Sequence, residues 1–191
     1  MKKKRCKLTF SKAQKEIEEL SKLNADQYID MYYGDASHFG LVPNVPYAWQ
    51  SKDDPVLLPS IRGKSTSVFG LMNTLGDLVY DFFDKTINSE MLIVFFDRFA
   101  QTIVKKTVVV LDNSSLHTSK KFKEKIKEWK ELDLLIYFIP PYSPELNKIE
   151  ILWRFVKYKW LKFDAYISFE NLKASLKNVL DNFGKKCIIN F

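Results

Sequence analysis

Residues 107–120 read TVVVLDNSSLHTSK, an apolar run that ends on a carboxylate. The run from residue 107 to residue 111 is short and rich in β-branched side chains, so it predicts a buried strand rather than a helix. Asp112 follows at the carboxyl end of that strand, where open sheets bind their ligands. Pattern alone leaves a second interpretation open, because an Asp-Asn pair after a strand also commonly begins an Asx turn.

A second carboxylate follows within IPPYSPELNKIEILWRFVK, residues 139–157. In the second half of this stretch the apolar residues recur at steps of three and four, which predicts a helix with one buried stripe. Glu150 lies off that stripe and shares a face with Arg154 and Lys157. Glu150 is therefore either a magnesium ligand together with Asp112, or one half of a surface ion pair with Arg154.

The first strand predicted along the chain supplies a third carboxylate. Residues 27–34 alternate, with Met31 and Tyr33 on one face, and the same period carries on to Asp35 just beyond the end of the strand. Asp30 points the other way in this pattern. We therefore expect Asp35, rather than Asp30, to join the other two carboxylates.

The remaining elements are predicted by helical spacing, by β-branched runs and by turn residues. Their order after the first strand is strand, strand, helix, strand, helix, strand, helix, helix, which is the order of a ribonuclease H-like fold. We expect an α/β protein with a mixed five-stranded sheet flanked by helices. The other predicted elements are a short helix at 12–23, two strands within 65–80, a helix at 89–103, a helix capped by Ser119, a strand at 134–139 and a last helix capped by Ser168.

Composition excludes several classes of protein. Hydrophobic residues make up 46% of the 191 residues, which argues against disorder, and no apolar run approaches the roughly 20 residues of a membrane span. The basic N-terminus has no apolar segment after it and does not read as an export signal. The net charge of +7 favours a polyanionic partner. One basic block, either a solvated tail or a phosphate contact, comprises Lys2, Lys3, Lys4, Arg5 and Lys7.

The segments LDNSSLHTSK (111–120) and IPPYSPELNKIEILWRFVK (139–157) closely resemble the catalytic core of the DDE transposases of the mariner-like and related bacterial insertion-sequence superfamily. Members have a strand ending in Asp-Asn with a nearby His, and then Pro-x-Tyr-Ser-Pro-(Asp/Glu)-Leu-Asn-Pro-Ile-Glu before an aromatic-rich helix. Lys148 stands in place of the usual last Pro. YGDASHFG, Trp49 and SVFGLMN give a looser match, with Ala36 in place of a second acid, and the likeness spans roughly residues 28–163.

The resemblance implies a role for each candidate residue. The catalytic and metal-binding triad is Asp35, Asp112 and Glu150, which would hold two Mg²⁺ or Mn²⁺ ions. Asn113 and His117 are supporting residues, and His117 either orients the site, touches a phosphate or merely caps the surface near a helix start. DNA phosphates are expected to contact Lys148, Arg154 and Lys157, for which a plain solvated face is the alternative.

The function implied by the resemblance is metal-dependent DNA cleavage and strand transfer at the ends of a transposable element. We expect residues 1–27 to form a basic segment with a short linker helix and residues 28–191 to form the catalytic domain, without the usual N-terminal helix-turn-helix region. The chain would then be the catalytic part of a longer protein, or one frame of a split transposase. The expected partners are DNA and a second copy of the chain, in a bacterial cytoplasm and associated with the nucleoid.

Two other functions stay open at this point. A ribonuclease H-like nuclease acting on another nucleic acid, such as an RNA–DNA hybrid, would use the same metal ions. A domesticated, non-catalytic DNA-binding protein is the second alternative, although loss of an acidic residue would be expected in such a protein and all three candidates are present.

Overall fold

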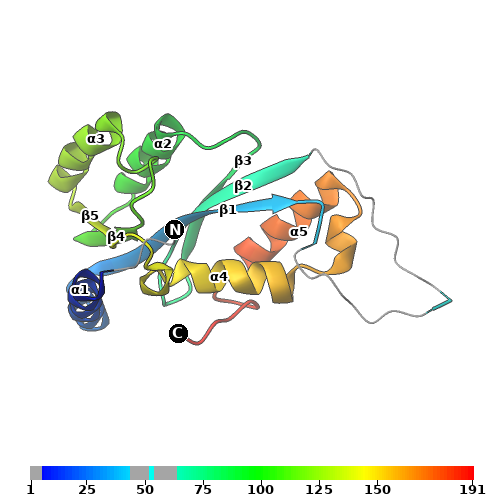
Figure 1. Ribbon diagram of the computed structural model, residues 1–191, viewed down its shortest axis with the longest axis horizontal. Coiled ribbons are helices and arrows are strands. Elements are labelled where there is room, and N and C mark those ends of the chain that lie inside the picture. The colour runs from blue at the N-terminus through cyan, green and yellow to red at the C-terminus, as the bar shows by residue number, and fades with distance from the viewer. Residues whose placement is uncertain (1–5, 44–51, 54–63) are drawn as a thin grey trace.

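A five-stranded mixed sheet forms the centre of the protein in the computed structural model, which describes residues 6–43, 52–53 and 64–191 (Figure 1). The strand order is β3-β2-β1-β4-β5. β1 pairs antiparallel with β2, and β2 with β3, whereas β4 runs parallel to both β1 and β5. The strands are β1 Asp30–Gly40, β2 Ser65–Met72, β3 Leu78–Phe83, β4 Thr107–Leu111 and β5 Leu134–Phe138.

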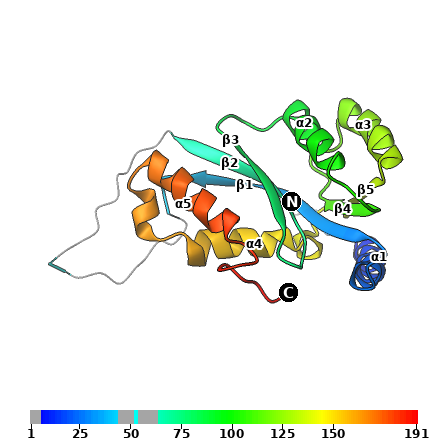
Figure 2. The same ribbon diagram turned by 180° about the vertical axis from the view of Figure 1, so that it is seen from behind.

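Helices cover both faces of the sheet (Figures 1 and 2). On one face lie α2, Ser89–Ala100, and α3, Lys120–Glu131. On the other lie α1, Lys7–Ala25, α4, Ile149–Phe155, and α5, Phe169–Asp181. All five residues of β4 are buried, which explains its unbroken apolar sequence, since a central parallel strand is covered on both sides.

The crossover from β4 to β5 passes through α3 as the sequence predicted. The Ser119 hydroxyl accepts a hydrogen bond from the backbone N–H of Phe122 at 3.3 Å and so caps the helix. Phe122 and Trp129 are fully buried against the sheet, while the lysines of the helix lie outside. The indole N–H of Trp129 donates to Asp97 of α2 at 2.8 Å, which joins the two helices of this layer.

A short 3₁₀ turn, Pro144–Leu146, leads into α4, which continues as a π-helical turn, Val156–Trp160, and a 3₁₀ turn, Phe163–Tyr166. Trp153 is buried in the core and packs on the sheet opposite Gly70. A Cβ atom at Gly70 would lie 3.3 Å from the Trp153 ring. The absence of a side chain at that position therefore lets α4 approach the sheet closely.

Two expected boundaries were wrong. β1 runs to Gly40 rather than stopping at residue 34, so Asp35 lies within the strand, paired in register with Gly70 of β2. The strand continues because antiparallel pairing with β2 extends past the end of its pairing with β4. α1 is also longer than residues 12–23 and packs on the sheet through Ala13 and Ile17.

Some predictions cannot be compared with the structure. The residues of the N-terminal basic block before Cys6, together with Trp49, lie outside the described residues. Among the helices that are described, none is long and apolar enough to cross a membrane.

Candidate active site

Asp35, Asp112 and Glu150 line one open cavity of about 400 Å³. They come from the middle of β1, from the carboxyl end of the adjacent strand β4 and from the first turn of α4. The rest of the wall is formed by Asn113, Ser114, Asn147 and residues 139–144. The fold thus brings together, at the carboxyl end of β4, three carboxylates that are far apart in the sequence.

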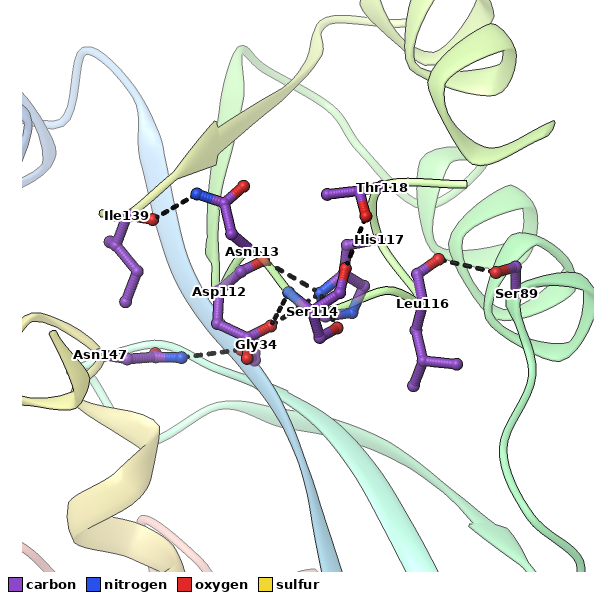
Figure 3. Close-up of polar contacts among 10 residues, drawn as sticks. All are labelled: Gly34, Ser89, Asp112, Asn113, Ser114, Leu116, His117, Thr118, Ile139 and Asn147. Carbon is purple, nitrogen blue, oxygen red and sulfur yellow. Dashed lines mark hydrogen bonds and ion pairs between the residues drawn. The ribbon is translucent and has the colours of Figure 1, made fainter. Parts of the chain in front are cut away.

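Asp112 is fixed by the loop that follows it (Figure 3). Its Oδ1 atom accepts the backbone N–H of Ser114 at 3.2 Å, so the Asx turn considered from the sequence does form. The same Oδ1 atom lies 3.0 Å from Nδ1 of His117. The hydrogen bond from His117 holds the pKa of Asp112 below its usual value. The turn and the site are therefore compatible, because the turn orients the carboxylate.

His117 is a buried residue, so the surface cap considered from the sequence was wrong. Only 3% of it is exposed, and its ring packs against Phe69 and Phe122 with ring centroids 6.0 and 5.5 Å away. Nδ1 also lies 3.1 Å from the Ser114 hydroxyl. Nε2 is buried and has no hydrogen-bond partner among the residues described. The packed ring can thus hold Asp112 in a single orientation.

Two side-chain amides tie together the elements that carry the carboxylates (Figure 3). Asn113 donates to the main-chain oxygen of Ile139 at 2.8 Å and joins the ends of β4 and β5. Asn147 donates to the main-chain oxygen of Gly34 at 2.9 Å, and its own main-chain oxygen accepts the N–H of Glu150 at 3.1 Å. Asn147 therefore links the helix that carries Glu150 to the strand that carries Asp35.

Asn147 belongs to the sequence motif of residues 139–157, but the sequence predicted no role for its side chain. No local pattern could have revealed the contact of the Asn147 side chain, because its partner, the main-chain oxygen of Gly34, is 113 positions away. Its partner Gly34 is equally constrained. A Cβ atom at Gly34 would lie 2.6 Å from Leu111 and 2.7 Å from Leu71, closer than packed carbon atoms approach. A side chain there would require the ends of the Leu111 and Leu71 side chains, on the two neighbouring strands, to shift.

The three carboxylates repel one another. Burial raises the pKa of Asp35 to about 7, and the nearby charges of Glu150 and Asp112 add to this effect. Burial also raises the pKa of Glu150, with the charge of Asp112 adding to the effect and the Lys157 ammonium opposing it. A cation bound between the carboxylates would relieve this repulsion.

The donor set fits magnesium or manganese, which prefer a few carboxylate oxygens and retain water ligands. Asp112 is 47% exposed at its side chain, so it is accessible from the cavity. Within the described ranges, no three His, Cys, Asp or Glu side chains are already close enough to form a closed metal cluster. Ion binding would have to draw the carboxylates together.

The basic residues predicted to contact DNA are placed differently from one another. Lys157 lies nearest the site: burial lowers its pKa, while the charges of Asp35 and Glu150 oppose that shift. Arg154 is exposed, one helical turn after Glu150. Lys148 instead lies over the ring of Tyr33, with its Nζ atom 5.8 Å from the ring centroid, and lines a separate cavity beside α1.

The sheet order is that of a ribonuclease H-like fold, and three carboxylates line one cavity at the carboxyl end of β4. The sequence model of the DDE superfamily endonucleases matches residues 30–173, well over half of the chain, and the chain therefore belongs to this family. The DDE family and the mixed sheet expected from the sequence are both confirmed. Membership makes this domain a DDE endonuclease domain.

Solved structures of Mos1 transposase share the fold. The Mos1 paired-end complex with the left transposon end has a TM-score of 0.67 and 16% identity, over 95% of this chain and 57% of that chain. The catalytic domain of Mos1 mariner transposase has a TM-score of 0.61 and 14% identity, over 95% of this chain and 85% of that one. A Mos1 mariner paired-end complex with Mn has a TM-score of 0.64 and 18% sequence identity, over 94% of this chain and 56% of that chain.

A curated relative, the uncharacterized protein y4pE/y4sA of Sinorhizobium fredii, is 29% identical over 65 residues. The match covers 34% of this chain and 44% of the relative. The chain thus spans less than half of this relative and little more than half of the Mos1 chains in the end complexes.

Proposed function

We propose that this chain is the catalytic domain of a DNA transposase that cleaves DNA strands at element ends and joins them to target DNA. The observation that carries the proposal is the single cavity lined by Asp35, Asp112 and Glu150. Family membership supports the endonuclease chemistry, and solved Mos1 complexes contain transposon ends and, in separate structures, Mn or Mg.

Asp35, Asp112 and Glu150 would together hold two divalent ions. When bound, such a pair supplies activation of the attacking water or 3′-hydroxyl and stabilises the leaving oxygen in phosphoryl transfer. His117 keeps the Asp112 carboxylate ionised and oriented. Lys157 favours ionisation of Glu150 and, with Arg154, presents positive charge to a DNA phosphate. Lys148, at the N-terminus of α4, would contact a phosphate outside the carboxylate cavity, beside Tyr33.

The working complex would contain more than this chain. The partners are DNA and a second copy of the chain, and the DNA ends would be read by an N-terminal DNA-binding region carried elsewhere in the protein or in another reading frame. Isolated, this domain should bind DNA with little sequence preference. A cytoplasmic, nucleoid-associated location goes with this function.

The test is nicking of supercoiled plasmid DNA by the full 191-residue chain with Mg²⁺ or Mn²⁺, compared with Asp112→Ala. We expect the wild type to nick and the variant to lose at least 100-fold, with its circular dichroism spectrum unchanged. Glu131→Ala, an exposed acid at the end of α3, is the matched control and should nick normally. Robust metal-dependent nicking by Asp112→Ala would sink the assignment.

The same assay separates the alternatives. Preferential cleavage of an RNA–DNA hybrid over duplex DNA would favour a ribonuclease H-like nuclease instead. DNA binding without any metal-dependent cleavage, by wild type and Asp112→Ala alike, would favour a domesticated binding protein.

A further inference from the structure

A stripe of lysines runs along the outer side of α3. Successive residues of a helix are turned by about 100°, which places four of its six lysines within an arc of about 80°. All four are exposed. This α3 stripe comprises Lys120, Lys123, Lys127 and Lys130.

The other two lysines of α3 are neutralised by acidic neighbours. Lys121 forms an ion pair with Glu90 of α2, and Lys125 lies 3.1 Å from Asp97 and 2.7 Å from Glu128. In the stripe, Lys120 lies 4.0 Å from Glu124, whereas Lys123, Lys127 and Lys130 have no acidic partner in the part of the chain that the structure describes. These three lysines therefore lie together on one side of the helix, bordered by Glu124 and Glu131.

The stripe begins eight residues after Asp112, where the loop that follows β4 leads into α3. The loop from Asp112 to the helix cap at Ser119 is held by Thr118, whose N–H and hydroxyl both donate to the main-chain oxygen of Ser114, at 3.2 and 3.0 Å. A surface hollow of about 340 Å³ then follows the helix, lined by Thr118, Lys120, Lys123, Glu124 and Lys127. The carboxylate cavity ends at Ser114 of this loop and the hollow begins at Thr118, so the two hollows are lined by residues of one short segment.

We propose that the α3 stripe binds the phosphate backbone of target DNA, an inference that rests on the proposed transposase function. Lys123 and Lys130 lie about 10.5 Å apart along the helix axis. Phosphates of one strand advance by about 3.4 Å along a duplex, so the part of the stripe from Lys123 to Lys130 spans about three of them. Lysine is a point charge that does not read bases, which suits a duplex accepted without regard to its sequence.

The test compares two triple variants of the full chain that remove the same charge. The first is Lys123→Gln with Lys127→Gln and Lys130→Gln. The control is Lys177→Gln with Lys185→Gln and Lys186→Gln, at the end of α5 on the opposite face of the sheet. Gln has a helix propensity close to that of Lys, so both proteins should fold, which circular dichroism verifies.

Binding of a 30-base-pair duplex of arbitrary sequence is measured between 50 and 200 mM salt, with Ca²⁺ in place of Mg²⁺. Each lost phosphate contact lowers the salt slope by about 0.9, so the α3 variant should have a slope smaller by about 2.7. Raising the salt concentration fourfold should therefore weaken DNA binding by the α3 variant about 40-fold less than it weakens DNA binding by the wild type. The α5 control should keep the wild-type slope.

Equal slopes for the two triple variants, or an unchanged slope for the α3 variant, would overturn the inference while leaving plasmid nicking, and hence the proposed function, intact. Loss of affinity confined to DNA that carries the element's own ends would also overturn it, because the stripe would then hold end DNA. Failure of the wild type both to bind and to nick DNA would overturn the inference and the proposed function together.

Discussion

The side-chain amide of Asn147 donates a hydrogen bond of 2.9 Å to the main-chain oxygen of Gly34, one residue before Asp35. Asn147 itself is 3% exposed and accepts the N–H of Glu150 through its main chain. This contact sets how the Glu150 helix lies on the Asp35 strand. Asn147 thus controls where two of the three cavity carboxylates stand without lying between them and a ligand.

Replacing Asn147 with Ala should therefore weaken metal binding as well as the fold. Leaving a buried carbonyl without its partner costs about 1–3 kcal/mol in the free energy of unfolding. We further expect the dissociation constant for Mn²⁺, measured by electron paramagnetic resonance, to rise about tenfold or more, since misplaced ligands lose affinity on this scale. Asn171→Ala, an exposed asparagine of α5, is the control and should change neither quantity. An unchanged Mn²⁺ affinity in Asn147→Ala would show that the contact is merely structural.

His117→Ala should release the Asp112 carboxylate. Loss of the hydrogen bond from His117 should raise the pKa of Asp112 toward its usual value of 3.8. In the wild type the pKa of Asp112 is lower in the folded protein than in the unfolded chain, so the ionised carboxylate stabilises the fold. This stabilisation is present above the unfolded-state pKa and is lost as pH falls through the folded-state pKa. The variant should accordingly lose less stability than the wild type between pH 5 and pH 2. Carboxyl carbon NMR follows the pKa directly, and an Asp112 titration identical in the two proteins would refute the orienting role.

The parts of this site that sequence predicted are those encoded locally. Asp112 follows an unbroken β-branched run and Glu150 falls off an apolar helical stripe, and both patterns lie within a few residues of the carboxylate itself. The cap at Ser119 was predictable for the same reason. Local patterns thus made Asp112 and Glu150 candidates, each with an alternative left open, and the period of the first strand made Asp35 the third.

The parts that were missed depend on contacts between distant residues. β1 extends to Gly40 because β2, beginning at Ser65, pairs with it, and polar residues such as His38 gave no sign of that pairing. The burial of His117 follows from packing under α3, and the role of Asn147 follows from a bond to a residue more than a hundred positions away. Periodicity carries no information about such partners.

The raised pKa of Asp35 predicts how stability of the metal-free protein depends on pH. Because the pKa of Asp35 is higher in the folded protein than in the unfolded chain, the protonated carboxyl group stabilises the fold. This stabilisation is fully present below the unfolded-state pKa of 3.8 and is lost as pH rises through the folded-state pKa of about 7. The loss amounts to up to about 4 kcal/mol, reduced by solvent screening. In EDTA, thermal unfolding of the wild type should therefore occur at a lower temperature at pH 8 than at pH 5.

Asp35→Asn is the matched variant for that experiment. It should flatten the decline between pH 5 and pH 8 and unfold at a higher temperature than the wild type at pH 8, while losing plasmid nicking. Adding Mn²⁺ should stabilise the wild type at pH 8 more than the variant, because the ion offsets the repulsion among the carboxylates. Parallel pH profiles for the two proteins in EDTA would contradict the placement of Asp35 beside Glu150 and Asp112.

Lys157 should act on the site through charge, in contrast to Arg154. The Lys157 ammonium lowers the pKa of Glu150, so Lys157→Met should raise that pKa further and leave the Glu150 carboxylate less ionised as pH falls. The Mg²⁺ concentration for half-maximal nicking should rise in the variant, and it should rise more at pH 6.5 than at pH 8.5. Arg154→Met removes an exposed charge and should weaken DNA binding about equally at both pH values. If the Mg²⁺ requirement of Lys157→Met were the same at the two pH values, Lys157 would be acting on DNA alone and not on the carboxylates.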